Sequence, residues 1–209
     1  MSEHQSNPPG KPTGVSTKEL LVLSLGSGVI YILIALLLYQ YFHDTPLVTV
    51  LFEGMPVLHQ LGIGVLFGAV AAAIVGYISY QPPVAEIIRD FTIIDFVLNT
   101  RFTLFDRTQI SFVAGISEEI LFRGAIQPLI GVWWTSLIFV ALHGYFLFKT
   151  PAHLMLGVMM FTLSVGLGYL FIWSGLIAAI AAHIVYDFLL LEAVTRWGVP
   201  ERRNSPLSD

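Results

Sequence analysis

The segment SEEILFRG, residues 117–124, lies inside an apolar run that extends over residues 110–130. A charged side chain at the centre of a bilayer costs about 2.5–3.5 kcal/mol even on the most lenient insertion scale. Glu118, Glu119 and Arg123 are therefore expected to face the interior of a helix bundle rather than lipid. The segment predicts a membrane helix whose polar residues need partners.

Helical spacing supplies one of these partners. Glu119 and Arg123 are four residues apart, so they lie on one helix face in the order that favours an ion pair. Glu118 points about 100° away around the helix axis, and no residue within a turn neutralises it. A spare buried carboxylate either becomes protonated or serves a function. Two interpretations stay open here, an ion-paired lock between helices and a functional carboxylate.

The composition is that of a polytopic membrane protein. Of the 209 residues, 56% are hydrophobic and 11% are charged, against about 45–50% and 25% in an average soluble domain. There is no cysteine, which excludes disulfides and thiolate metal sites. A net charge of −4 without a basic run gives no indication of nucleic-acid binding.

Apolar runs predict an all-α bundle of about six transmembrane helices, each long enough for a hydrocarbon core of about 30 Å. The expected spans are residues 20–42, 58–80, 109–127, 132–148, 154–173 and 176–194. Between the second and third spans, residues 84–105 carry charges together with apolar positions every three or four residues. This pattern is typical of an amphipathic helix in the membrane interface, with a connecting helix packed on the bundle as the alternative.

The sequence predicts one transmembrane domain, residues 20–195, with the polar motifs in a core of about residues 108–195. Residues 1–19 are expected to be a disordered tail and residues 196–209 a polar tail. If both tails lie on the same side of the membrane, every Lys and Arg except Arg123 falls on that side. The positive-inside rule therefore predicts a multi-pass protein of the cell membrane with both termini in the cytoplasm.

Two further predicted spans carry histidines at helical spacing from a second side chain. Phe139 and His143 are four residues apart, as are His183 and Asp187. A single buried His most often makes only an interhelical hydrogen bond. Three helices that each carry polar or titratable side chains on one face are less readily explained by coincidence. At about 1.5 Å per residue from the nearest cationic residue, these groups and Glu118 are expected about 9–20 Å deep, where one cavity could hold them.

Such a cluster suits two kinds of hydrolysis. In the first, Glu118 takes a proton from a water molecule that attacks a carbonyl carbon, and imidazole donors stabilise the oxyanion. In the second, Glu118, His143 and His183 bind a divalent metal such as zinc, which activates the water. Neither mechanism needs a Ser or Cys nucleophile.

Three motifs follow one another along the chain: Glu118-Glu119-x-x-x-Arg123, Phe139-x-x-x-His143 and His183-x-x-x-Asp187. In type and order they resemble those of the CAAX protease and bacteriocin-processing family, also called the abortive-infection family, of type II CAAX prenyl endopeptidase-like intramembrane proteases. The resemblance covers about residues 111–191 and does not include the first two spans.

The resemblance implies an intramembrane endopeptidase in which Glu118 activates the water and His143 assists it. His183 with Asp187 would form the oxyanion side of the site. Members of that family that act on prenylated proteins have an Asn at the position that corresponds to Asp187. Because an ionised Asp cannot donate a hydrogen bond, Asp187 is expected here to orient His183 or to stay protonated.

Glu119, Arg123 and Phe139 are expected to shape the site. The expected partners are the lipid bilayer and a membrane-associated protein or peptide substrate, cleaved near its C-terminus or in the maturation of a peptide or sorting tag. No cofactor is expected, with zinc as the alternative, and no oligomeric state follows from the sequence. A non-enzymatic immunity protein or a proton-coupled transporter that uses the buried acids as a relay is the alternative function.

Overall fold

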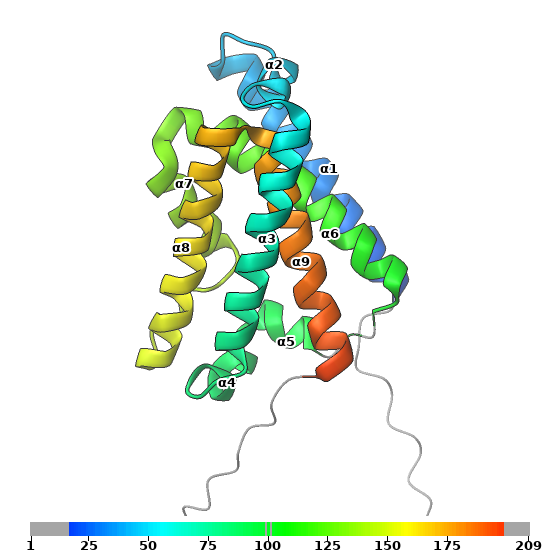
Figure 1. Cartoon of the computed structure of the whole chain (residues 1–209), viewed down its shortest axis with the longest axis vertical. Coiled ribbons are helices and arrows are strands. Elements are labelled where there is room, and N and C mark those ends of the chain that lie inside the picture. Colours follow the sequence, from blue (N-terminus) through cyan, green and yellow to red (C-terminus); the bar gives the residue numbers. More distant parts are fainter. Residues whose placement is uncertain (1–16, 99, 101, 199–209) are drawn as a thin grey trace, which may run out of the picture.

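The computed structural model describes residues 17–98, 100 and 102–198, and this part of the chain consists of helices and short connections, without a strand. Five of its helices are long and apolar enough to cross a membrane. They are α1 (Thr17–Phe42), α3 (Val57–Ser79), the continuous segment Leu104–Leu142, α8 (Pro151–Ser174) and α9 (Leu176–Trp197). Figure 1 shows them as a bundle, which confirms the predicted all-α membrane fold.

The segment Leu104–Leu142 joins the third and fourth predicted spans. It comprises α6 (Leu104–Glu119), a π-helical stretch η2 (Ile120–Ile126) and α7 (Gln127–Leu142). The chain bends at Gly131, whose φ of 82° is readily available only to glycine. The second arm, residues 132–142, extends about 16 Å, too short to cross a core of about 30 Å by itself.

The predicted bounds of the fourth span were therefore wrong. Helix α7 ends at Leu142, and residues 143–150 form a non-helical connection where the sequence predicted helix as far as residue 148. The turn after the helix consists of His143 and Gly144, and Gly144 has a φ of 74°. This early end places His143 at the C-terminus of a helix.

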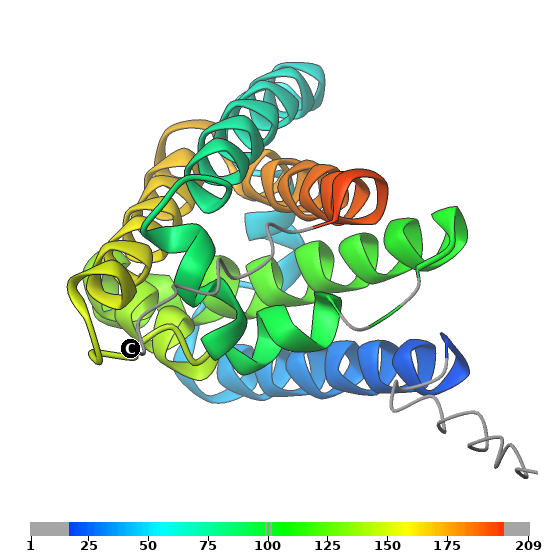
Figure 2. The same ribbon diagram turned by 90° about the horizontal axis from the view of Figure 1, so that it is seen from below.

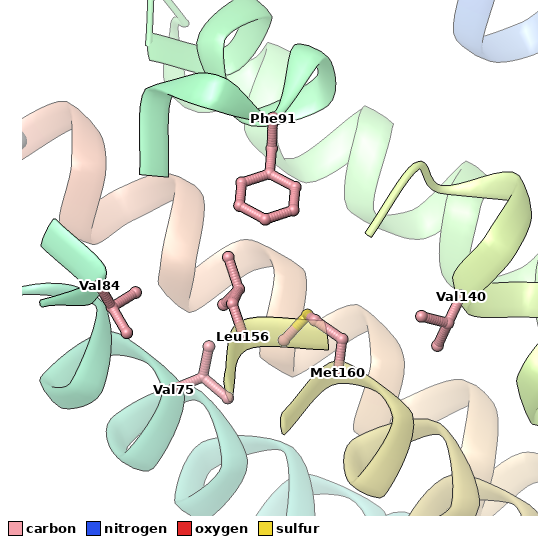
Figure 3. Packing of buried hydrophobic residues seen from close by; sticks show 6 residues of the cluster. All are labelled: Val75, Val84, Phe91, Val140, Leu156 and Met160. Atoms are coloured by element: carbon pink, nitrogen blue, oxygen red, sulfur yellow. The ribbon is translucent and has the colours of Figure 1, made fainter. Parts of the chain in front are cut away.

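The single interfacial helix predicted over residues 84–105 was also wrong. The segment is divided into α4 (Val84–Ile87), a 3-10 turn η1 (Ile88–Asp90) and α5 (Thr92–Leu98). The chain becomes extended at Phe91, which ends η1 and is 1% exposed. Figure 3 shows the ring of Phe91 directed toward Leu156, in the cluster that also contains Met160. Burial of this ring in the bundle thus prevails over local helix periodicity.

The remaining boundaries differ in smaller ways. The connection between the first two predicted spans contains a short helix, α2 (Leu47–Phe52). Helix α1 already begins at Thr17, and α9 extends to Trp197. The rest of the two predicted tails, residues 1–16 and 199–209, lies outside the described residues.

Hydrogen bonds between connecting segments show which helix ends lie together at each end of the bundle. The backbone N–H of Met55, before α3, donates to Ser174 O at the α8–α9 turn, with an N···O distance of 2.8 Å. Tyr80, after α3, donates through its hydroxyl to the carbonyl of Gly198, after α9. Figure 1 shows α2 at the first end and α4 and α5 at the second, where α9 also finishes. Figure 2, seen from that second end, shows α4 and α5 lying across the ends of the long helices.

Helices α3 and α9 pack closely because glycines of α3 face the α9 backbone. A Cβ on Gly68 would lie 2.3 Å from Ala182 O, whereas one on Gly62 would meet nothing within 4 Å. Gly68→Leu should therefore destabilise the protein by about 1–3 kcal/mol or more, as overpacking does. Thermal unfolding of the purified protein in detergent measures this, with Gly62→Leu as the matched control. Equal unfolding temperatures for the two variants would contradict this account of the α3–α9 contact.

Candidate active site

The described structure brings the side chains of the three motifs together. Glu118 is near the C-terminal end of α6, His143 follows α7, and His183 lies on α9. The Oε2 atom of Glu118 is 3.5 Å from His143 Nε2 and 3.9 Å from His183 Nε2. One carboxylate is thus flanked by two imidazoles that come from separate helices.

The ring of His143 is held by its own helix. Its Nδ1 lies 2.8 Å from the carbonyl oxygen of Phe139, and the two rings stack with centroids 4.2 Å apart. Because a carbonyl only accepts, Nδ1 is the donor of this hydrogen bond. The Nε2 atom is consequently the one directed toward Glu118.

His183 is placed between three carboxylates. Its Nδ1 is 2.7 Å from Glu119 Oε1, while its Nε2 is 3.4 Å from Asp187 Oδ2 and also faces Glu118. The sequence assigned the orientation of His183 to Asp187. In the structure Glu119 makes the shorter contact and engages the other ring nitrogen, so Glu119 positions this imidazole as well.

The predicted pair of Glu119 and Arg123 is present, with Arg123 Nη1 3.2 Å from Glu119 Oε1 and both side chains fully buried. Arg123 Nη2 also donates to Ser164, 2.9 Å to Oγ and 3.1 Å to the carbonyl oxygen. The guanidinium lies over the ring of Phe139, 4.7 Å from its centroid, in a cation–π contact. Arg123 therefore connects η2, α7 and α8 around the site.

Several groups at the site were not predicted from the sequence. Ser164, which holds Arg123, is one small polar residue in an apolar helix and gives no motif. Tyr145 and Tyr186 line the same cavity as Glu118, and neither belongs to one of the three motifs. Arg123 lies in the π-helical stretch η2, and such bulges are frequent at functional sites.

A cavity of about 610 Å³ contains the exposed parts of the cluster. Glu118, His143, His183 and Asp187 all line it, and most of its other walls are apolar side chains of α1, α3, α8 and α9. It extends to Tyr80 and Val194, at the end of the bundle where α3 and α9 finish. The polar side chains of the site thus lie at the wall of a cavity whose other walls are mostly apolar.

The metal alternative needs a set of ligands arranged around one point. Within the described ranges, no group of three or more His, Cys, Asp or Glu side chains is arranged to hold a metal ion. The zinc alternative, with Glu118, His143 and His183 as ligands, stays a prediction that a chelator experiment tests.

The fold and the site define a multi-pass helical membrane protein with a buried glutamate between two histidines. Residues 100–189 match the family model described as type II CAAX prenyl endopeptidase Rce1-like. The matched segment contains all three motifs, so the resemblance to this family that the motifs predicted is confirmed.

Similarity to a curated protein is confined to part of the chain. The chain is 38% identical over 79 residues to the uncharacterized protein YpbD of Bacillus subtilis (strain 168). The aligned region is 37% of this chain and 40% of that protein, so less than half of YpbD is covered. No solved structure matches the chain.

Proposed function

We propose that this protein is an intramembrane endopeptidase that hydrolyses a peptide bond of a membrane-associated protein or peptide, with Glu118 as the base that activates water. The observation that carries the proposal is the position of the Glu118 carboxylate, between His143 and His183 at the wall of a cavity. The match of residues 100–189 to a family model of endopeptidases supports it.

Glu118 has the free acceptor that a general base needs. Its Oε2 is buried and makes no hydrogen bond of normal geometry to any described residue, and Glu118 lines the cavity together with the two imidazoles. It takes a proton from a water molecule, and the water oxygen attacks the substrate carbonyl carbon to give a tetrahedral intermediate. The C–N bond then breaks as the proton passes from Glu118, with His143 assisting, to the leaving amine.

Glu119 and Arg123 act indirectly in this proposal. Glu119 fixes His183 through Nδ1, and Arg123 compensates the charge of Glu119 in a fully buried pair. Asp187 contacts Nε2 of His183 and lines the cavity. An electrostatically preorganised site of this kind needs no rearrangement of solvent during the reaction.

A chelator separates the proposed mechanism from the zinc alternative. We expect the purified protein to cleave its substrate at the same rate before and after treatment with a chelator, because every group in the proposed steps belongs to the chain. Cleavage of a fluorogenic membrane peptide in detergent or vesicles measures this. Loss of activity with the chelator and recovery with zinc would contradict the metal-free mechanism and assign Glu118, His143 and His183 to the metal.

We further propose that the protein lies in the cell membrane with both termini in the cytoplasm. The Met55–Ser174 and Tyr80–Gly198 contacts place the α2 connection and the end of α9 at opposite ends of the bundle, which is compatible with the positive-inside rule. A reporter inserted after Glu53 should therefore behave as external, and one after Gln81 as cytoplasmic. A cytoplasmic signal from the Glu53 fusion would reverse or exclude this topology.

A further inference from the structure

The π-helical stretch η2 joins the helix that carries Glu118 to the helix that His143 follows. Within it the backbone N–H of Gln127 donates to Phe122 O, as in a π-helix, and not to the carbonyl that an α-helix would offer. A π-helical turn holds one residue more than an α-helical turn, and each residue rotates a helix by about 100°. The rotation of Glu118 on α6 relative to α7 and His143 therefore depends on η2.

Helix α1 supplies hydrogen-bond donors to the carbonyl groups of this turn. The hydroxyl of Tyr39 donates to Gly124 O over 2.9 Å, and His43 Nε2 lies 2.8 Å from Ala125 O. Because a carbonyl only accepts, Nε2 is the donor of the second bond. Pro128, four residues after Gly124, has no N–H, so Gly124 O cannot accept the bond that an α-helix would provide. The hydroxyl of Tyr39 thus replaces a donor that the sequence after η2 lacks.

Contacts on two sides hold η2 in place. On one side the ring of Tyr39 is buried and stacks on that of His43, with centroids 4.2 Å apart. On the other side α8 accepts hydrogen bonds from Arg123 and from Gln127, the latter at the carbonyl oxygen of Gly168 over 3.0 Å. The π-helical turn is therefore held between α1 and α8.

A row of aromatic rings leads from α1 to the site. Tyr31 of α1 meets Phe122 of η2 edge to face, with centroids 6.3 Å apart, and Phe122 meets Phe139 in the same way at 4.9 Å. Phe139 stacks on His143. Closely packed interiors transmit strain, so a shift of η2 relative to α1 would reach the imidazole that flanks Glu118.

We infer that Tyr39 and His43 are positioning residues of the active site. By holding η2 in its π-helical form, they set the rotation that brings Glu118 Oε2 to 3.5 Å from His143 Nε2. Neither residue lines the cavity, so both act through the backbone of η2. The inference rests on the proposed function and adds α1, which lies outside the matched residues 100–189, to the structure that the reaction needs.

Tyr39→Phe should lower kcat by about 10–10²-fold with little change in KM, because misplacing a catalytic group by about 1 Å can cost about 10²-fold. The variant removes only the hydroxyl that donates to Gly124 O. Peptide cleavage per folded molecule measures this, with Tyr41→Phe, at an exposed position of the same helix, as the matched control. A lower yield and unfolding temperature with an unchanged kcat per folded molecule would show a purely structural role and overturn the inference.

Two variants of His43 separate its hydrogen bond from its packing. Leu and Gln are similar in size, but only Gln carries an N–H group that can take the place of Nε2. We expect His43→Leu to lower kcat as Tyr39→Phe does, and His43→Gln to restore most of the rate. His59→Leu, at an exposed position of α3, should leave the rate unchanged. Equal rates for His43→Leu and His43→Gln would contradict the role of the His43 donor.

A cross-linking experiment tests the inference without peptide cleavage. The chain has no cysteine, so Glu118→Cys combined with His143→Cys introduces a single thiol pair. A short bifunctional thiol reagent should link this pair readily in the Tyr41→Phe background and several-fold less in the Tyr39→Phe background, as measured by mass spectrometry. Equal linking in the two backgrounds would overturn the inference, whether or not the protein cleaves peptides.

The outcomes for the inference and for the proposed function are distinct. An unchanged kcat of Tyr39→Phe, in a preparation where Glu118→Gln is inactive, overturns the inference and leaves the proposed function in place. Equal background cleavage by the wild-type protein and Glu118→Gln ends the proposed function. The cross-linking result then decides by itself whether α1 positions Glu118 against His143.

Discussion

Glu118→Gln should abolish proteolysis while leaving the helix bundle folded. The substitution keeps the size of the side chain and its ability to form hydrogen bonds, but it removes the basic carboxylate that flanks His143 and His183. A general base contributes about 10²–10⁴ to the rate, so cleavage should fall by at least this factor. Peptide cleavage by the purified protein, with thermal unfolding measured in parallel, checks both parts.

The matched control is Glu86→Gln, the same substitution at an exposed carboxylate of α4, which should leave the rate unchanged. A comparison of membrane and secreted peptides in cells that carry wild-type protein or Glu118→Gln would also identify the natural substrate. Undiminished cleavage by Glu118→Gln would end the proposal. A wild-type protein that cleaves nothing, together with a full biological effect of Glu118→Gln, would support the transporter or immunity alternative.

Arg123→Ala should lower the amount of folded protein as well as its activity. Removing one partner of a buried ion pair typically costs about 3–5 kcal/mol, because the other charge remains buried without compensation. Here the loss deprives Glu119 of its guanidinium partner and also removes the hydrogen bonds to Ser164 and the contact with Phe139. Thermal unfolding in detergent and the yield of purified protein measure the effect.

Arg196→Ala provides the control, because Arg196 forms the same type of pair with a Glu four residues away but has an exposed side chain. An exposed pair of this kind contributes about 0.3–0.5 kcal/mol, so this variant should unfold almost as the wild type does. Normal stability and yield of Arg123→Ala, combined with a loss of activity, would instead assign Arg123 to the catalytic steps.

Local sequence patterns were sufficient to predict most of the long helices. An apolar run of sufficient length has few alternatives to a membrane helix, and α1, α3, α8 and α9 lie close to their predicted bounds. The ion pair of Glu119 and Arg123 was predictable for a similar reason, since residues four apart on one helix are neighbours whatever surrounds the helix.

Predictions that depended on packing between elements were less successful. Residues 84–105 have the periodicity of one helix, yet the chain turns at Phe91 to bury that ring against α8. The helix that contains Glu118 continues through Pro128 and bends only at Gly131. Local signals do not record how much stability is gained when a ring or a small residue meets a neighbouring helix.

The sequence by itself determined an all-α membrane bundle, the three motifs and the need of Glu118, Arg123 and His183 for polar partners, because the cost of burying a charge holds in any fold. Apart from the pairing of Arg123 with Glu119, only the tertiary structure decided which partners they have. Ser164 reaches Arg123 from α8, and Glu119 reaches His183 from α6. Hydrogen bonds form only within about 3.5 Å, so such pairings depend on how the helices are placed against one another, which residue spacing along a single helix does not specify.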